Sequence, residues 1–155
     1  MSSFLISKKI ISFITKPDMK TYSVVILFIL IISASSVAQV PDSLKYRSLR
    51  PAEFQAEYQK AEKGILVDVR EFFEYRKSRI NNAINIPSSG HLESAADTIG
   101  KNNSLFFYCT SGFRSKRVAK YFYEKGFTRL YSLDGGIAAW RKAKLPVVRK
   151  KLKKK

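Results

Sequence analysis

A single cysteine is followed closely by a glycine and an arginine, and this group has the most specific chemistry in the sequence. Cys109 is the only cysteine among 155 residues, and Gly112 and Arg114 come shortly after it. Glycine adopts backbone conformations that other residues avoid, so the N–H groups of such a loop can converge on one point and bind an anion. A guanidinium beside the thiol adds a full positive charge, which favours the thiolate. We therefore expect Cys109 to be a catalytic nucleophile in an anion-binding loop.

The segments on either side of this loop indicate how the thiol is positioned. Residues 104–108 form a short apolar run that is typical of a buried strand. Residues 115–125 carry Val118 and Phe122 at helical spacing. The loop thus joins the carboxyl end of a strand to the amino end of a helix, where the helix dipole adds positive charge. The predicted substrate-binding residues are those of the loop: Thr110, Ser111, Gly112, Phe113 and Arg114.

Strands and helices alternate along the rest of the chain. Further strands are predicted at 65–67, 83–86 and 128–131, and further helices from Pro51 onward and at 71–77, 92–99 and 137–143. Such alternation with short connections predicts an α/β domain whose parallel sheet has helices on both faces. Ligands bind beyond the carboxyl ends of the strands in such sheets, which is where Cys109 lies.

Three charged residues near a predicted strand end are interpreted as loop-bracing residues. Asp68 and Arg70 follow the strand at 65–67, and Glu74 lies in the next helix. A buried charge needs hydrogen-bonding partners, so bracing of the Cys109 loop is expected rather than catalysis. His91, the only histidine, lies in a polar loop and is interpreted as a surface residue.

Two chemistries fit a thiolate in an anion-binding loop. One is sulfur transfer through a cysteine persulfide, and the other is phosphate or arsenate chemistry on a tetrahedral oxyanion. A persulfide adds one sulfur atom and needs a smaller cradle than a phosphoryl group with three oxygens. No metal is expected, because one cysteine and one histidine cannot supply a site, and no cofactor motif is present.

The chain resembles the single-domain rhodanese-like sulfurtransferases from about Leu49 to Val147. Four stretches match that family's pattern in the right order: 66–70 with Glu74-Tyr75, 80–87, 108–115, and 133–140 with 145–147. The resemblance implies a five-stranded parallel sheet with helices on both faces. It also implies that Cys109 forms the persulfide, and that the loop amides and Arg114 hold the transferred sulfur or the anionic donor. Related dual-specificity phosphatases have one more residue between cysteine and arginine, so the spacing here favours sulfur over phosphate.

Three functional hypotheses follow. The first is a sulfurtransferase that moves a sulfane sulfur from an anionic donor such as thiosulfate to a thiophilic acceptor, a thiol or cyanide, through a Cys109 persulfide. The second is a sulfur carrier or interaction module that receives sulfur from a protein partner. The third is arsenate or phosphate chemistry.

The first 38 residues have the pattern of a secretory signal peptide. Lys20 precedes an apolar core at 23–32 and small residues at 33–38, with cleavage expected after Ala38. Residues before Met19 are explained either by an upstream start codon read in error or by a long n-region. A periplasmic or secreted protein is therefore expected, and a retained membrane anchor facing the periplasm is the alternative.

The domain boundaries follow from composition. A linker is predicted at 39–47, the rhodanese-like domain at 48–147, and a basic disordered tail at 148–155. The net charge is +17, and this positive surface would steer an anionic donor. The tail is expected to be solvated, with contact to an anionic membrane as the alternative. Nucleic acid is not an expected partner, because the chain is predicted to be exported and has no groove-reading motif.

Overall fold

The computed structural model describes Ser23 and residues 40–149. The predicted signal peptide, apart from Ser23, and residues 150–155 of the predicted tail lie outside the described residues. The described elements are α3 (Asp42–Lys45), β1 (Arg47–Leu49), α4 (Pro51–Lys60), β2 (Gly64–Asp68), α5 (Phe72–Lys77), β3 (Ser78–Arg79), β4 (Ile84–Asn85), α6 (Leu92–Thr98), β5 (Ser104–Tyr108), α7 (Phe113–Glu124), β6 (Leu130–Leu133), α8 (Gly136–Lys142) and β7 (Val148–Arg149).

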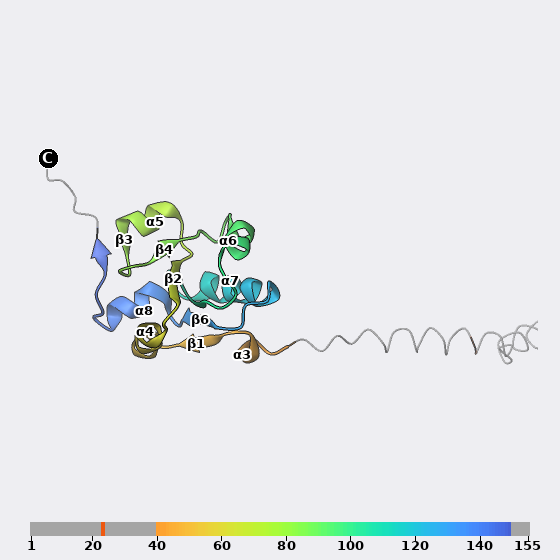
Figure 1. Cartoon of the computed structure of the whole chain (residues 1–155). Helices are drawn as coiled ribbons and strands as arrows, with labels where there is room; N and C mark the ends of the chain where they lie inside the picture. Colours follow the sequence, from red (N-terminus) through yellow and green to blue (C-terminus); the bar gives the residue numbers. More distant parts are fainter. Residues whose placement is uncertain (1–22, 24–39, 150–155) are drawn as a thin grey trace, which may run out of the picture. The chain divides into compact units, whose positions relative to one another are not determined.

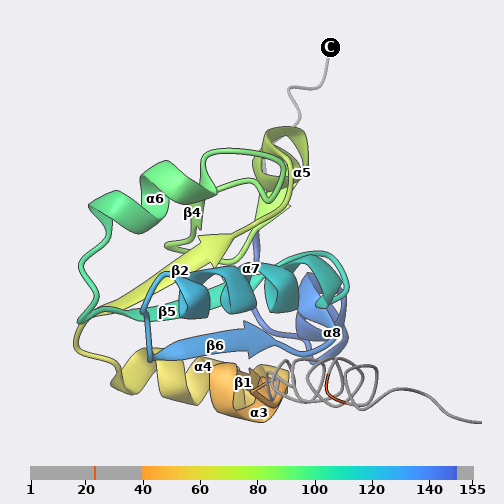
Figure 2. The ribbon, with the colours of Figure 1, turned by 90° about the vertical axis from the view of Figure 1, so that its right-hand side faces the viewer.

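Five strands form one parallel sheet in the order β1-β6-β5-β2-β4. Figure 1 labels β1, β6, β2 and β4 in this order from bottom to top, and Figure 2 labels β5 between β6 and β2. The central strand β5 pairs with β2 along its whole length, from Gly64 opposite Ser104 to Asp68 opposite Tyr108. Parallel neighbours need crossover connections, and helices supply them here. The predicted five-stranded α/β sheet is therefore confirmed.

Alternation along the central strands gives the domain a core on each face of the sheet. Val67 and Phe107 face α6 and α7, where they pack with Phe122. Phe106 faces the opposite side and packs with Phe54 of α4 in the cluster that α8 completes. Figure 2 shows α7 lying over β5 and β6. Helices therefore cover both faces, as the sequence predicts.

The carboxyl ends of β2, β5 and β6 meet at one edge of the sheet, and Cys109 lies there directly after β5. Two backbone hydrogen bonds extend the pairing beyond the strands. The N–H of Val69 donates to the carbonyl of Tyr108 over 3.0 Å, and the N–H of Asp134 donates to the carbonyl of Leu49 over 2.8 Å. This edge is where open parallel sheets bind ligands.

The predicted linker at 39–47 is wrong for most of its length. Residues 42–45 form α3, and Arg47 begins β1, which pairs with β6 as the edge strand of the sheet. The N-terminal boundary of the domain therefore lies before α3. A three-residue strand with only Leu49 buried gives too short a hydrophobic pattern to be detected in the sequence.

The ends of several other elements also differ from the predictions. Val148 and Arg149, assigned to the tail, form β7 and pair antiparallel with β3. The strand predicted at 128–131 lies at Leu130–Leu133, and α7 begins at Phe113 rather than at Ser115. Element ends fray and depend on tertiary contacts, so sequence patterns locate them least well. No helix among the described residues is long and apolar enough to cross a membrane.

Candidate active site

The loop after β5 wraps its own backbone around the Cys109 sulfur. Gly112 has a φ of 94°, in the left-handed region, and its N–H donates a hydrogen bond of 3.1 Å to Cys109 Sγ. A side chain at Gly112 would be strained at this φ, and its Cβ would come within 3.2 Å of the backbone of Leu133 and Gly135. One loop amide therefore reaches the sulfur in the structure.

The Cys109 thiol is buried, but its surroundings favour the ionised form. The residue exposes only 1% of its surface and forms no disulfide. Burial raises the pKa of the thiol, while the backbone N–H groups of Ser115, Ser111 and Gly112 lower it, and the net result is a pKa below the ordinary value. Hydrogen bonds to a thiolate favour the charged state in this way.

Two buried serines, Ser115 and Ser132, stabilise the loop through a chain of hydrogen bonds. The hydroxyl of Ser115 donates to the carbonyl of Gly112 over 3.0 Å, and the hydroxyl of Ser132 on β6 donates to Ser115 over 2.9 Å. Ser132 is fully buried, so its hydroxyl needs this partner. Neither serine was singled out as a site residue in the sequence, because a serine in a strand or helix has no spacing signal of its own.

The amino end of α8 donates two backbone hydrogen bonds to the loop. Ile137 N–H donates to Cys109 O over 2.8 Å, and Ala138 N–H donates to Thr110 O over 3.2 Å. These are first-turn amides of α8, which have no partners within their own helix. The first residue of α8 also packs beside the loop, since Gly136 is buried against Cys109 and Thr110.

Glu74 ties the loop to α5. Its carboxylate accepts hydrogen bonds from Thr110 Oγ1 over 2.8 Å and from both terminal nitrogens of Arg114 over 3.0 and 3.3 Å. Burial raises the pKa of Glu74, but the hydrogen bonds from Arg114 and Thr110 outweigh it and leave the pKa below its ordinary value. Glu74 thus contacts the loop as its predicted bracing role requires.

Asp68 and Arg70 do not form the predicted hydrogen bonds to the Cys109 loop. Arg70 Nε donates to Asp68 Oδ1 over 2.9 Å, and Arg70 Nη2 donates to the carbonyl of Ser78 over 2.6 Å. Both side chains are buried, and none of their hydrogen bonds among the described residues reaches 109–114. They stabilise the connection from β2 to β3, so their predicted bracing of the loop is wrong.

The remaining predicted residues lie at the surface of the site. Thr110 and Ser111 are exposed at the top of the loop, and Phe113 leaves 69% of its surface in solvent at the start of α7. His91 is exposed before α6, as predicted. No group of three or more His, Cys, Asp or Glu side chains within 40–149 is arranged to hold a metal ion.

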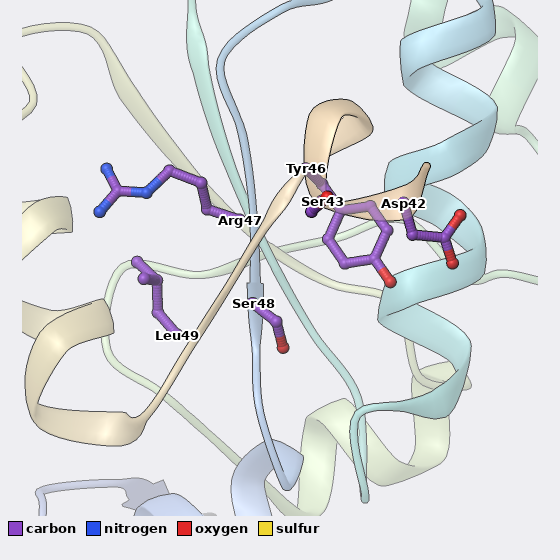
Figure 3. A pocket seen from close by; sticks show the side chains of 6 residues that line it. All are labelled: Asp42, Ser43, Tyr46, Arg47, Ser48 and Leu49. Carbon is purple, nitrogen blue, oxygen red and sulfur yellow. The ribbon is translucent and has the colours of Figure 1, made fainter. Parts of the chain in front are cut away.

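A pocket of about 470 Å³ lies along α3 and β1, away from the thiol. Figure 3 shows Arg47 and Leu49 on one side of β1 and Ser48 on the other, as expected for a strand. The lining residues are consecutive or nearly so: Asp42, Ser43, Tyr46, Arg47, Ser48 and Leu49. None of these residues belongs to the Cys109 loop, so this pocket is not part of the candidate active site.

The fold and the loop define an α/β domain that presents a buried cysteine at the carboxyl edge of its sheet, with a loop amide bonded to the sulfur. The chain belongs to the rhodanese-like family, because the family described as "Rhodanese-like domain" matches residues 50–143. The predicted resemblance is thereby confirmed.

The relatives that this chain matches in sequence include proteins of similar length and longer ones. It is 34% identical to the uncharacterized protein YqhL of Bacillus subtilis over 119 residues, which cover 74% of this chain and 91% of that protein. It is 35% identical to the tRNA uridine(34) hydroxylase of Yersinia pestis over 86 residues, 52% of this chain. Only 24% of that enzyme is covered, so the likeness concerns one part of it.

Solved structures show the same fold. A rhodanese-related protein from Thermoplasma volcanium superposes with a TM-score of 0.58 at 28% identity, covering 68% of this chain and all of that one. The CoADR-RHD protein of Bacillus anthracis superposes with a TM-score of 0.54 at 25% identity, covering 62% of this chain and 16% of that one. The domain therefore occurs both alone and within larger proteins.

Proposed function

We propose that this protein is a sulfurtransferase in which Cys109 carries a sulfane sulfur as a persulfide. Membership of the rhodanese-like family supports sulfur transfer or related chemistry. The observation that carries the proposal is the 3.1 Å hydrogen bond from Gly112 N–H to Cys109 Sγ, within a loop that lowers the pKa of the thiol. A thiolate held by amides is a nucleophile, and a terminal persulfide sulfur is an anion that the same amides stabilise.

The donor we propose is a small anion such as thiosulfate. The Cys109 thiolate attacks the outer sulfur, the S–S bond of thiosulfate breaks, and sulfite leaves with the electron pair, so Cys–S⁻ and S₂O₃²⁻ give Cys–S–S⁻ and SO₃²⁻. An acceptor such as cyanide then takes the outer sulfur as thiocyanate and restores the thiolate. Arg114 lies at the loop, where its positive charge would attract the donor.

The size of the loop supports sulfur rather than phosphate as the transferred group. Four residues separate Cys109 from Arg114, and the thiol is almost completely covered. A single sulfur atom fits such a cradle more easily than a tetrahedral oxyanion. We therefore expect the protein to have neither phosphatase nor arsenate reductase activity. Assays of these two activities test this expectation.

A second candidate function is a sulfur relay with a protein partner. Three phenylalanine side chains lie exposed near the thiol loop: Phe113 in the first turn of α7, and Phe72 and Phe73 on α5 beside Glu74, with exposed fractions of 69%, 58% and 73%. Exposed aromatic side chains of this kind mark protein contact sites. Loading of Cys109 by a protein persulfide but not by thiosulfate would favour this function.

We also propose that the protein acts outside the cytoplasm. The support is the signal-like pattern of residues 1–38 in the sequence. Cell fractionation followed by N-terminal sequencing tests it. A new N-terminus at Gln39 in the periplasm or medium supports export with cleavage, an intact chain in the membrane fraction supports a retained anchor, and a cytoplasmic protein overturns the proposal.

Intact mass spectrometry tests the proposed chemistry. The full-length chain is measured before and after incubation with thiosulfate, with Cys109→Ser as the matched control, and cyanide is then added and thiocyanate assayed. We expect the wild type alone to gain one sulfur atom and to lose it as thiocyanate. The absence of any gain with thiosulfate would overturn transfer from this donor and leave the relay as the leading function.

A further inference from the structure

A small pocket lies beside the thiol loop, between α7 and the segment that leads into α6. Its volume is about 180 Å³, and its lining residues are Ser88, Leu92, Arg114, Arg117, Val118 and Tyr121. Those on α7 follow an i, i+3, i+4, i+7 pattern, so they form one face of that helix. Ser88 lies at the carboxyl edge of the sheet, where its N–H donates to the carbonyl of Val69 over 3.0 Å.

The polar lining of the pocket is positively charged. Arg114 and Arg117 contribute two guanidinium groups, Ser88 and Tyr121 contribute hydroxyls, and no lining residue is acidic. Arg114 is already paired with Glu74. Arg117 is exposed and forms no ion pair with another described residue, so its charge is available to a ligand. The planar guanidinium fork suits a carboxylate.

The rest of the lining is apolar, and the pocket is small. Leu92, Val118 and the ring of Tyr121 supply the apolar wall. A volume of about 180 Å³ is below the roughly 300–1,000 Å³ of a complete small-molecule site. It therefore suits one end of a ligand, a charged head on a short hydrocarbon stem, rather than a whole cofactor.

Arg114 belongs to both the pocket and the thiol loop. It lines the pocket while its Nη2 donates to Thr110 Oγ1 over 3.0 Å, next to Cys109 in the chain. We propose that this pocket is an acceptor subsite, which binds the carboxylate end of a small organic thiol while the thiol end reaches the sulfur on Cys109. This inference rests on the proposed sulfurtransferase function and names the class of its acceptor.

The transfer step balances without any further reactant. The acceptor enters as the thiol RSH, and its proton passes to the outer sulfur of the Cys109 persulfide anion. The resulting thiolate RS⁻ attacks that outer sulfur and forms a new S–S bond. The bond from Sγ to the outer sulfur breaks, and its electron pair returns to Cys109. The products are RSSH and the Cys109 thiolate, and the proton stays on the transferred sulfur.

Two acceptors that differ only in charge test the subsite. The full-length chain is loaded with sulfur and discharged by 3-mercaptopropionate or by its neutral amide, at matched thiolate concentrations. We expect kcat/KM to be about tenfold higher for the carboxylate, the value of one charge-assisted hydrogen bond. We expect Arg117→Gln to remove most of this preference. Arg129→Gln, which removes an exposed arginine before β6 at the opposite edge of the sheet, should retain it.

A protection experiment separates failure of the subsite from failure of the proposed function. The unreactive thioether 3-(methylthio)propionate is added to the unloaded chain, and the alkylation of Cys109 by iodoacetamide is followed by mass. We expect slower alkylation in the wild type and in Arg129→Gln but not in Arg117→Gln. A chain that cannot be loaded but shows this protection retains the subsite and loses the transfer function. Equal discharge by acid and amide, or protection that is unchanged in Arg117→Gln, would overturn the subsite.

Discussion

The backbone N–H of Ile137 donates a 2.8 Å hydrogen bond to the carbonyl oxygen of Cys109, so the helix after the last strand of the sheet holds the residue with the thiol. The next amide, Ala138 N–H, holds the carbonyl of Thr110. In a trans peptide the carbonyl and the following N–H point in opposite directions. Anchoring Thr110 O on α8 therefore turns Ser111 N–H away from α8 and toward the sulfur, whose pKa it lowers.

Gly136 allows this close approach, so replacing it should disturb both stability and chemistry. A Cβ at Gly136 would lie 2.5 Å from Cys109 O and 2.6 Å from Thr110 O, and its φ is 58°. For Gly136→Ala we expect a loss of about 2–4 kcal/mol in the free energy of unfolding, from left-handed strain and overpacking together. Persulfide loading should fall by at least about tenfold.

Gly126→Ala is the matched control, because Gly126 has a φ of 87° but nothing within 4 Å of an added Cβ. It should lose only about 1–2 kcal/mol of unfolding free energy, from strain alone, and keep its loading rate. Urea denaturation and the loading assay measure both. Equal behaviour of the two variants would contradict the role given to the contact between α8 and the loop.

The thiol of Cys109 should react with a small alkylating reagent at lower pH than a free cysteine does. Its pKa is lowered from an ordinary 9.0, so the rate against pH should have its midpoint below 9.0. Ionisation should also stabilise the fold. Because the folded-state pKa is depressed, the contribution is complete above pH 9.0 and is lost as pH falls through the folded pKa.

Denaturation of the wild type and of Cys109→Ser across this range checks the sign. The stability difference in favour of the wild type should grow as pH rises toward 9.0 and then level off. A difference that shrinks with rising pH would mean that burial outweighs the loop amides.

Glu74→Gln should weaken the loop without unfolding the protein. The Glu74–Arg114 pair is partly exposed, so its loss should cost about 1 kcal/mol or less of unfolding free energy. Arg114 and Thr110 lose their shared carboxylate, and we expect kcat/KM for thiosulfate to fall by several-fold to about tenfold. The lowered pKa of Glu74 means that the stability difference disappears as pH falls through the folded pKa.

Glu93→Gln is a suitable control for that substitution, since Glu93 pairs with Lys125 at an exposed position on α6. We expect its stability to stay within about 0.5 kcal/mol of the wild type and its kinetics to be unchanged. If Glu74→Gln behaves in the same way, Glu74 does not position the loop.

Asp68→Asn should destabilise the fold strongly but leave the chemistry of the folded fraction intact. It leaves the buried guanidinium of Arg70 without its carboxylate, which we expect to cost about 3–5 kcal/mol. The exposed pair of Asp134 with Lys116 offers the comparison, and Asp134→Asn should cost about 1 kcal/mol or less. Guanidinium denaturation measures both variants. A stable Asp68→Asn variant with impaired loading would instead place Asp68 in the catalytic machinery.

The sequence by itself was enough for the parallel sheet and for the location of the thiol. Apolar runs such as 104–108, alternating with helical patterns, carry information over a few neighbouring residues, and that range is sufficient to identify buried strands. Likewise, Cys109, Gly112 and Arg114 lie within six consecutive residues, so the geometry of this group is largely local.

Only the tertiary structure decided what surrounds that loop. The bonds from Ile137 to Cys109, from Ser132 to Ser115 and from Glu74 to Arg114 join residues far apart in the chain. The same is true of β1, which becomes a strand because it pairs with β6. Asp68 and Arg70 are close in the chain, but only the structure shows that they pair with each other rather than with the loop. Local sequence determines which residues are able to make such contacts, whereas the packing of distant elements determines which partner each one finds.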